Sequence, residues 1–372
     1  MTTPTVILAG GGSGGHIFPN VAIAERLRDR FPNLRAIHLV SERAVDRAIA
    51  DARSLDARPL PASPLAFSPR GLARFAAGWG PSLRAARTII QDARTHGPVA
   101  LVASGGFVSA PAVAAARAER IWSCLVNLDA SLGKANRLGA RFTPHRFVVA
   151  GVAPRGWTAI TPVVRAAFDA LPDQAAARTA LGLDPARPTL LVTGGSQGAA
   201  SITRGLAAAL RDLPGALAGW QALHQAGPEH EAELADAYER AGADATIRPF
   251  LERMPEAWAA ATLAVARGGA GTIAEAWASR TPVIVLPYPH HRDAHQAANA
   301  RPLEAVGAAV IVPDRVDPAR TAPDLARALR EALARADAMT AAAGSLPAAR
   351  GAAAVAEAAA RALAPASAFD PG

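Results

Sequence analysis

Three glycine-rich turns carry most of the chemistry that this amino-acid sequence offers. Each turn lies between a short apolar run and a segment with the period of an amphipathic helix. Glycine lets the backbone approach a ligand closely, and the amides and dipole at the start of the following helix attract an anion. The sequence therefore predicts phosphate-binding turns at residues 10–15, 194–198 and 267–275.

The third turn adds side chains to these backbone donors. Thr272 and Glu275 are three residues apart, which places them on one face of a helix. A diphosphate bound to the amides of this turn would place a ribose near Glu275, whose carboxylate can accept hydrogen bonds from both sugar hydroxyls. The alternative is that Glu275 only caps or pairs on the helix surface. Its position directly after a glycine turn favours a binding role.

A polar loop, residues 287–299, follows the apolar run 282–286. At the carboxyl edge of a parallel sheet such a loop would lie where α/β proteins bind ligands. Its histidine and glutamine side chains suit the hydroxyls of a sugar. Three histidines and an aspartate could instead form a metal site. No metal is expected, because the glycine turns already neutralise a diphosphate without a cation.

The first turn alone leaves a second interpretation open. Residues 10–15 fit the G-x-G-x-x-G pattern of dinucleotide-binding proteins, and Glu42 ends the next apolar run, where a ribose-binding acid would lie. A dehydrogenase is therefore an alternative at this point. The repetition of the turn in the second half of the chain weakens it.

Parallel sheets must position these turns, because short apolar runs alternate with Ala- and Arg-rich stretches of helical period. In the first half, strands are expected at residues 5–9, 35–40, 99–103, 121–126 and 146–149. In the second half they are expected at residues 189–193, 221–224, 245–249, 263–266 and 282–286.

Two domains follow from this pattern, since each half opens with a strand, a glycine turn and a helix, at residues 18–31 and 201–213. We expect Rossmann-like domains at 1–160 and 161–340, because residues 151–162 have the Pro and Gly content of a linker. Residues 341–372 are expected to form C-terminal helices that pack back towards the N-terminal domain, with a disordered tail.

The composition is that of a globular protein, with 372 residues, 51% hydrophobic and 19% charged. The net charge of +8 indicates an anionic partner, such as a nucleotide, a phospholipid or a nucleic acid. A single cysteine, Cys124, allows no disulfide within the chain and favours a reducing compartment. The start of the chain lacks the basic region of a signal peptide. Residues 97–116 are uncharged, but glycines and prolines divide them, so a buried strand is expected instead of a membrane span.

These segments together resemble the MurG-type glycosyltransferases of family 28. That family transfers N-acetylglucosamine from UDP-N-acetylglucosamine to undecaprenyl-diphospho-muramoylpentapeptide. The matching segments occur in the family's order along most of the chain. They are residues 11–19, 105–111, 194–199, 224–227, 250–254, 267–275 and 293–300.

The resemblance implies an α/β protein of the GT-B type, with two doubly wound Rossmann-like domains facing a cleft. The N-terminal domain would bind the acceptor and the C-terminal domain the UDP-sugar. The implied reaction inverts the anomeric centre, with a base taking the proton of the acceptor 4-hydroxyl. The implied partners are UDP-N-acetylglucosamine, a lipid-linked diphosphate and an anionic membrane surface, with no cofactor and no nucleic acid. The implied location is the cytoplasmic face of the inner membrane, as a peripheral protein.

The resemblance also assigns site residues. His16 and Asp129 are the candidate catalytic residues, although His16 could instead only orient the acceptor diphosphate. The donor-binding set is Arg165, Ser196, Gln197, Leu251, Ala270, Gly271, Thr272, Glu275, His295 and Gln296. The acceptor-binding set is Ser13, Gly14, Gly15, His16, Gly105, Gly106, Asn127 and Asn136.

The chain departs from the family at one acceptor-side motif. Where the family usually reads His-Glu-Gln-Asn, this chain reads Val-Asn-Leu-Asp, so Asn127 and Asp129 replace a glutamate and an asparagine. The hypothesis is that Asp129 supplies a carboxylate from a slightly different place. A second departure is Gly268, where the family often has serine.

A membrane surface is suggested by residues 68–90, which mix arginines with bulky apolar side chains. An ordinary amphipathic helix with its aromatic residues in the core is the alternative. The candidate membrane contacts are Arg70, Leu72, Arg74, Phe75 and Trp79.

Three other functions stay open on the sequence. A related GT-B glycosyltransferase could use a different lipid or a small-molecule acceptor. A UDP-N-acetylglucosamine 2-epimerase would share the fold and need no acceptor site. A non-enzymatic descendant that binds a sugar nucleotide is the third.

Overall fold

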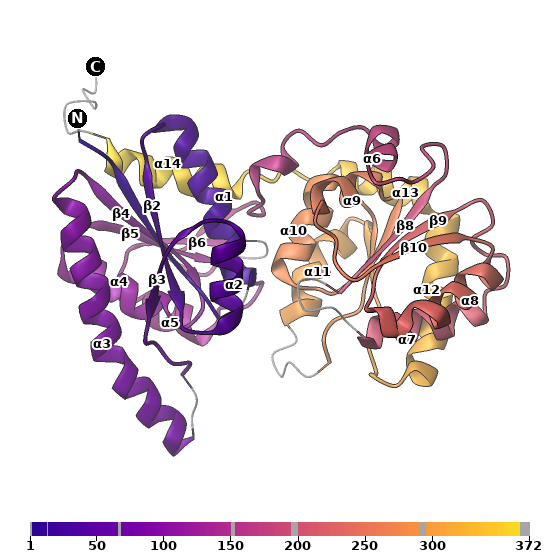
Figure 1. Cartoon of the computed structure of the whole chain (residues 1–372), viewed down its shortest axis with the longest axis horizontal. Helices are drawn as coiled ribbons and strands as arrows, with labels where there is room; N and C mark the ends of the chain where they lie inside the picture. The colour runs from indigo at the N-terminus through magenta and orange to yellow at the C-terminus, as the bar shows by residue number, and fades with distance from the viewer. Residues whose placement is uncertain are drawn as a thin grey trace. The chain divides into compact units, whose positions relative to one another are not determined.

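The chain folds into two compact units, each built on its own parallel sheet (Figure 1). This computed structural model describes residues 2–12, 14–65, 68–149, 153–194, 200–289 and 295–364. The first unit comprises Met1–Ala166 together with Ala349–Gly372, and the second comprises Ala167–Ala348.

The first unit has a 7-stranded sheet in the order β3-β2-β1-β4-β5-β6-β7. Its strands are β1 (Thr5–Gly10), β2 (Arg35–Ser41), β3 (Asp56–Leu60), β4 (Val99–Gly105), β5 (Trp122–Asn127), β6 (His145–Val149) and β7 (Thr158–Ile160). Its helices are α1 (Gly14–Arg30), α2 (Ala44–Ala52), α3 (Pro69–Arg94), α4 (Ser109–Ala118), α5 (Lys134–Gly139) and α14 (Gly351–Leu363).

The second unit has a 6-stranded sheet in the order β10-β9-β8-β11-β12-β13. Its strands are β8 (Thr189–Thr193), β9 (Gln221–Gln225), β10 (Asp244–Arg248), β11 (Leu263–Ala266), β12 (Val283–Val285) and β13 (Ala309–Ile311). Its α-helices are α6 (Gln174–Ala180), α7 (Ala200–Arg211), α8 (Glu231–Ala241), α9 (Met254–Ala260), α10 (Ala270–Ser279), α11 (His295–Ala305), α12 (Pro318–Ala334) and α13 (Ala336–Gly344).

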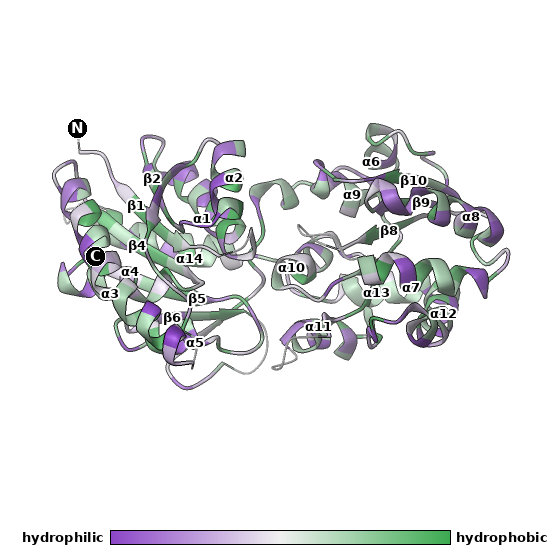
Figure 2. Ribbon diagram, turned by 60° about the horizontal axis from the view of Figure 1, so that its bottom comes forward, coloured by the Kyte–Doolittle hydropathy of each residue, from purple (hydrophilic) through white to green (hydrophobic). Residues whose placement is uncertain are grey.

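Continuous apolar runs form the central strands because helices cover both faces of a parallel sheet. Every residue of β1, β4, β8 and β11 is buried. In Figure 2 the strands are mainly hydrophobic, and hydrophilic residues lie mainly on the surrounding helices. Cys124 belongs to this core, and burial raises the pKa of its thiol above the ordinary value, as expected of an inert structural cysteine.

The ten strands expected from the sequence are all present, within about two residues at their ends. Three edge-proximal strands were missed: β3, β7 and β13. The residues of β3 (Asp-Ala-Arg-Pro-Leu) are half-buried or exposed except for Leu60, so they lack the apolar run that marks a central strand. Strand β7 lies in the stretch expected as a linker and pairs with β6, and the first unit continues to Ala166.

The uncharged segment 97–116 contains β4, a turn and most of α4. Within the described part of the chain, no helix combines the length and the apolar character needed to cross a bilayer.

The chain returns to the first unit at its end. Helix α14 packs on α1, β4 and β5. The start of α14 lies so close to the end of β7 that a Cβ atom on Gly351 would come within 2.1 Å of the carbonyl oxygen of Thr161.

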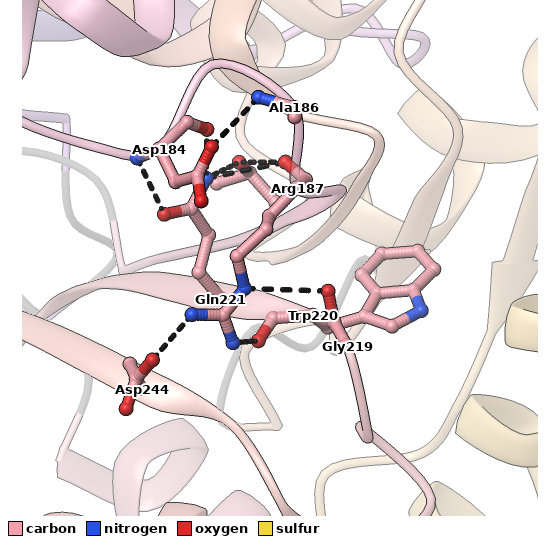
Figure 3. Close-up of polar contacts among 8 residues, drawn as sticks. Asp184, Ala186, Arg187, Gly219, Trp220, Gln221 and Asp244 are labelled. Carbon is pink, nitrogen blue, oxygen red and sulfur yellow. Dashed lines mark hydrogen bonds and ion pairs between the residues drawn. The ribbon is translucent and has the colours of Figure 1, made fainter.

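Polar contacts join the amino ends of β8, β9 and β10 (Figure 3). Arg187 pairs with Asp244 and donates to the carbonyl oxygen of Trp220. Gln221 donates to the carbonyl oxygens of Asp184 (2.7 Å) and Arg187 (3.1 Å). Side chains of the protein itself therefore occupy this edge of the second sheet.

Buried histidines make the fold sensitive to acid. His224 on β9 is fully buried, its Nδ1 lies 2.9 Å from the Tyr238 hydroxyl, and loss of solvation lowers its pKa to about 3. A lowered folded-state pKa means that the unfolded chain binds more protons below pH 6.5, so stability falls as the pH falls. We expect the second unit to lose about 2 kcal/mol of unfolding free energy between pH 6.5 and pH 5 through His224 alone.

Denaturant unfolding as a function of pH tests this expectation. His224→Gln should flatten the dependence below pH 6.5, whereas the matched change His96→Gln at an exposed position should leave it as in the wild type. Equal slopes for the wild type and His224→Gln would contradict the assignment.

Candidate functional site

Each sheet has a topological switch point where the strand order reverses, and ligands of open α/β sheets bind at the carboxyl ends of the strands there. In the first sheet this point lies between β1 and β4, and in the second between β8 and β11. The first and third glycine turns follow β1 and β11 directly, and residues 194–198 follow β8. The first and third predicted turns therefore lie at the switch-point edges of the two sheets.

Two side chains at the start of α2 fix the first glycine turn. The Asp46 carboxylate accepts hydrogen bonds from the Gly12 amide (2.7 Å) and the Ser41 amide (3.0 Å). Arg43 donates to the Gly12 carbonyl oxygen (3.2 Å). Sequence reasoning missed Asp46, which is buried in α2 and is joined to the turn only through the fold.

The first glycine turn packs against the turn between β4 and α4. Gly106 has a φ of +76°, and a Cβ atom there would lie 2.1 Å from the carbonyl oxygen of Gly11. Only glycine tolerates both the conformation and the contact. The structure therefore brings Gly14, Gly15 and Gly106 to one edge, while the predicted contact Ser13 lies outside the described residues.

His16 lies between these two turns. Its Nδ1 is 3.1 Å from the Ser104 carbonyl oxygen, and a Cβ on Gly105 would lie 2.9 Å from the ring. A carbonyl oxygen can only accept, so Nδ1 carries the hydrogen and Nε2 of the neutral ring has a free lone pair. Loss of solvation lowers the pKa of His16, and the charges of Asp129 and Asp46 and the Ser104 hydrogen bond oppose this shift only in part. The geometry gives His16 a basic nitrogen at neutral pH.

Asn127, at the site of the motif departure, organises the loop that follows β5. Its Nδ2 donates to the carbonyl oxygens of Asp129 (2.5 Å) and Ser131 (3.2 Å), and its Oδ1 accepts from Asn136 (2.7 Å). Asn127 is buried at 2% exposure, so these bonds fix the loop. Asn127 therefore stabilises the conformation of the loop after β5.

Replacing Asn127 by glutamate, the residue usual in the family, is expected to destabilise the first unit. In Asn127→Glu, a carboxylate oxygen would face two carbonyl oxygens that now accept from Nδ2. We expect the first unit to lose about 2–3 kcal/mol of unfolding free energy, measured by denaturant titration, because buried acceptors are left without donors.

Asp129→Asn is the matched control, because the hydrogen bond from Asn127 goes to the backbone carbonyl oxygen of Asp129 and is kept in this variant. It changes the charge of the same loop and should leave the stability within about 0.5 kcal/mol of the wild type. A fully stable Asn127→Glu protein would contradict this role of Asn127.

The third glycine turn presents open backbone at the start of α10. Gly269 is its N-cap residue in an extended conformation, and the helix is 10 residues long. Gly271 is exposed, and no atom lies within 4 Å of a Cβ placed on it. The amides of Ala270, Gly271 and Thr272 therefore belong to a helix N-terminus of the kind that binds phosphate.

Glu275 lies on the same helix and is held by a buried tryptophan. The Trp258 indole Nε1 donates to the Glu275 Oε2 atom over 2.9 Å, and Trp258 has no exposed surface. The alternative that Glu275 pairs within the protein thus holds for this bond. The half-buried carboxylate is oriented by that bond, and Trp258 was not foreseen as its partner.

Arg267, the first residue of this turn, points into the protein. Its Nη1 contacts Asp314 Oδ2 (2.6 Å) and the Leu286 carbonyl oxygen (3.0 Å), and its Nη2 contacts the Ser201 hydroxyl (2.6 Å). Burial alone would raise the pKa of Asp314. Hydrogen bonds from Ser201, the Val316 amide and Arg267 outweigh burial and hold the pKa below its ordinary value.

The serine-to-glycine departure at Gly268 has a steric reason. A Cβ atom at Gly268 would come within 2.2 Å of the Gln296 carbonyl oxygen, and Asn299 donates to the Gly268 carbonyl oxygen over 2.9 Å. Helix α11 therefore lies against the turn. The side-chain oxygen of Gln296 accepts from the Tyr288 amide (2.8 Å).

The remaining predicted donor residues differ in how they are placed. Leu251 is buried, and its neighbour Phe250, at the carboxyl end of β10, is 61% exposed, so Phe250 is the side chain that a flat ring can reach. Arg165 belongs to the first unit, and its donor role stays a prediction. His295 begins α11 and is half-buried. Ser196 and Gln197 lie outside the described residues.

The metal alternative for the polar loop rests on three histidines and an aspartate, of which His290, His291 and Asp293 lie outside the described residues and His295 is described. Among the residues that the structure describes, no three His, Cys, Asp or Glu side chains are grouped as a metal site would require.

The candidate membrane residues lie at the start of α3. Arg70, Leu72 and Arg74 are exposed. Phe75 and Trp79 are half-buried, with ring centroids 5.6 Å apart, and Trp79 also contacts Phe142 at 6.1 Å. The aromatic residues thus pack partly on the protein, as the amphipathic-helix alternative expects, while the basic residues and Leu72 face the solvent.

Comparisons with known proteins agree with this architecture. Residues 6–147 match the glycosyltransferase family 28 N-terminal domain, and residues 189–359 match the glycosyltransferase family 28 C-terminal domain. The solved structure of Acinetobacter baumannii MurG superposes with a TM-score of 0.70 at 22% identity, covering 96% of this chain and 99% of that one. A glycosyltransferase of kitacinnamycin superposes with a TM-score of 0.62 at 17% identity, covering 98% and 100%.

Two curated relatives share a name, UDP-N-acetylglucosamine–N-acetylmuramyl-(pentapeptide) pyrophosphoryl-undecaprenol N-acetylglucosamine transferase. The protein from Paenarthrobacter aurescens is 37% identical over 84% of this chain and 83% of its own. The protein from Acidothermus cellulolyticus is 38% identical over 83% of this chain and 84% of its own.

Proposed function

The chain belongs to glycosyltransferase family 28, and from this premise we propose that it transfers N-acetylglucosamine from UDP-N-acetylglucosamine to undecaprenyl-diphospho-muramoylpentapeptide. It is a glycosyltransferase of the GT-B fold. The observation that carries the donor half is the α10 turn, where open amides precede a carboxylate that Trp258 orients.

The donor would bind along this turn. The amides of Ala270, Gly271 and Thr272 and the positive end of the α10 dipole would hold the diphosphate. Glu275 would accept from the ribose hydroxyls, and Gln296, with His295, would bind the sugar. Phe250 offers an exposed ring for the uracil.

The reaction would proceed by direct displacement. Nε2 of His16 takes the proton from the acceptor 4-hydroxyl as that oxygen forms a bond to C1 of the sugar. The bond from C1 to the β-phosphate oxygen breaks, and UDP leaves with the electron pair. The turn amides stabilise the charge that develops on the diphosphate. The amides around Gly14, Gly15 and Gly106 would bind the diphosphate of the acceptor.

A radiolabelled transfer assay tests the function directly. With UDP-N-acetylglucosamine and a short-chain analogue of the lipid acceptor, we expect release of UDP and a labelled disaccharide on the lipid. Confirmed binding of the donor without transfer to this analogue would reject the acceptor. Formation of a free epimer of the sugar would instead identify an epimerase.

A different acceptor is the second candidate, and a specific observation favours it. The loop after β5 carries Asn127 in place of the family's glutamate and uses that asparagine for its own structure. Other lipid-linked diphosphates assayed in parallel would distinguish the two candidates.

We propose that the start of α3 meets the cytoplasmic face of the inner membrane. Each basic residue near an anionic surface adds about 1 kcal/mol. Reversing both charges in Arg70→Glu/Arg74→Glu should therefore weaken co-sedimentation with phosphatidylglycerol vesicles by roughly 30-fold or more.

The control reverses two exposed arginines of the second unit, Arg204→Glu/Arg330→Glu, with the same change in net charge. If both double variants lose vesicle binding equally, net charge explains the binding and the α3 surface is rejected.

A further inference from the structure

We infer that Arg267 is a positioning residue of the donor site, a buried cation that fixes the segments around the glycine turns and does not itself neutralise the diphosphate. This inference rests on the proposed function. An arginine directly before a phosphate-binding turn would ordinarily be assigned to the phosphate. The contacts of Arg267 are instead with groups of the protein itself.

The guanidinium group is committed to partners inside the protein. Only 9% of the Arg267 side chain is exposed, and its partner Asp314 has a side chain with no exposed surface. The Ser201 hydroxyl accepts from Arg267 (2.6 Å) and donates to Asp314 (2.7 Å), which closes a three-membered network. The Tyr288 ring covers the guanidinium carbon at 5.6 Å from the ring centroid.

These partners come from three separate segments at the carboxyl edge of the second sheet. Ser201 lies in the first turn of α7, directly after the glycine turn that follows β8. Leu286 and Tyr288 begin the loop after β12, and Asp314 lies in the loop after β13. Arg267 itself directly follows β11. The charge of one side chain therefore ties together the three loops and the helix start that surround the proposed UDP-sugar site.

The loop after β13 also has a strained backbone that this network holds. Val316 has a φ of +66°, which a β-branched residue seldom adopts. Its amide donates to Asp314 Oδ1 over 2.7 Å, while Asp314 Oδ2 accepts from Arg267 and Ser201. Strain of this kind persists where the surroundings over-determine the backbone and is frequent at ligand sites.

The experiment compares donor binding in the full-length wild type with Arg267→Met and Ser201→Ala. Titration calorimetry with UDP and steady-state kinetics in both substrates are the readouts. We expect the Kd for UDP and the KM for UDP-N-acetylglucosamine to rise roughly 10- to 100-fold in Arg267→Met, because misplaced binding groups lose that much. Ser201→Ala should raise both by about 5-fold with little change in Tm. The KM for the acceptor should stay within about twofold in each.

Arg178 supplies a matched control at the opposite end of the same strand. It is also buried, and it donates to the Ala260 carbonyl oxygen (3.1 Å) and to the Thr262 hydroxyl (2.9 Å), just before β11. Arg178→Met should lower Tm as Arg267→Met does, and it should leave the Kd for UDP unchanged. A purely structural role for Arg267 would make the two variants behave alike, which would overturn the inference.

The outcomes separate the inference from the function on which it rests. If the wild type binds neither UDP nor UDP-N-acetylglucosamine, the proposed function is wrong and the inference falls with it. If the wild type binds UDP and both Arg267→Met and Ser201→Ala bind it as tightly, only the inference is wrong. If Arg267→Met does not fold, Ser201→Ala decides by its Kd for UDP.

Discussion

Glu275→Ala is expected to lower kcat/KM for UDP-N-acetylglucosamine by about 100-fold, equivalent to roughly 3 kcal/mol of transition-state stabilisation. The carboxylate would accept two hydrogen bonds from the ribose, and bonds to a charged acceptor are about twice as strong as neutral ones. The side chain is half-buried and accepts from the buried Trp258 indole, so a fall in Tm is expected beside the kinetic loss. Steady-state kinetics with saturating acceptor measures the loss.

A substrate analogue assigns this loss to the ribose. The wild type should discriminate strongly against 2′-deoxy-UDP-N-acetylglucosamine, and Glu275→Ala should discriminate little, because the partner of the missing hydroxyl is gone. Trp258→Phe keeps an aromatic ring in the core and removes only the indole donor to Glu275. It should cost about 5- to 10-fold in kcat/KM. If Glu275→Ala lowered Tm and left the kinetics unchanged, Glu275 would be only a structural partner of Trp258.

His16→Asn is expected to lower kcat by about 100- to 10,000-fold, the range lost with a general base. Asparagine can still donate to the Ser104 carbonyl oxygen from the place of Nδ1, so the hydrogen bond that seats the ring is kept. What is removed is the basic Nε2 atom. Single-turnover transfer of labelled sugar measures the chemical step.

A second substitution separates the base from an orienting role. His16→Gln places an amide near Nε2 without basicity, so near wild-type kcat in this variant would show that His16 only orients the acceptor. The acid limb of the wild-type pH profile gives an independent reading. Since loss of solvation lowers the pKa of His16 below 6.5, kcat/KM should be retained at pH 6.5 and fall only at lower pH.

Much of the fold could be predicted because its signals are local. An apolar run followed by glycines and a helical period is contained in about twenty neighbouring residues, and β1, β8 and β11 were found in this way. Strand β3 was not predicted because this edge strand has only one buried side chain, Leu60, and therefore no apolar run. Strand β7 pairs with β6 through its backbone, and backbone pairing of this kind cannot be recognised from a pattern of side chains.

The roles of single side chains depended on contacts between distant parts of the chain. Trp258 and Glu275 are 17 residues apart, Arg267 and Asp314 are 47 apart, and Gly12 and Asp46 are 34 apart. The sequence indicated that Arg267 begins a binding turn. The structure shows that its side chain instead binds Asp314 and Ser201. Likewise, Asn127 was recognised as a departure from the family, and only the loop carbonyl oxygens that it binds explain why this chain keeps it.

The return of the chain to the first unit has a consequence during synthesis. Helix α14 completes the packing on α1, β4 and β5, yet the ribosome makes it after the entire second unit. The N-terminal domain of a protein usually folds first, but here the first unit cannot complete its packing until the second unit has been synthesised. The second unit can reach its native state while the nascent first unit still waits, with an apolar surface uncovered, for its last helix. That interval is when the growing chain most needs protection by a chaperone.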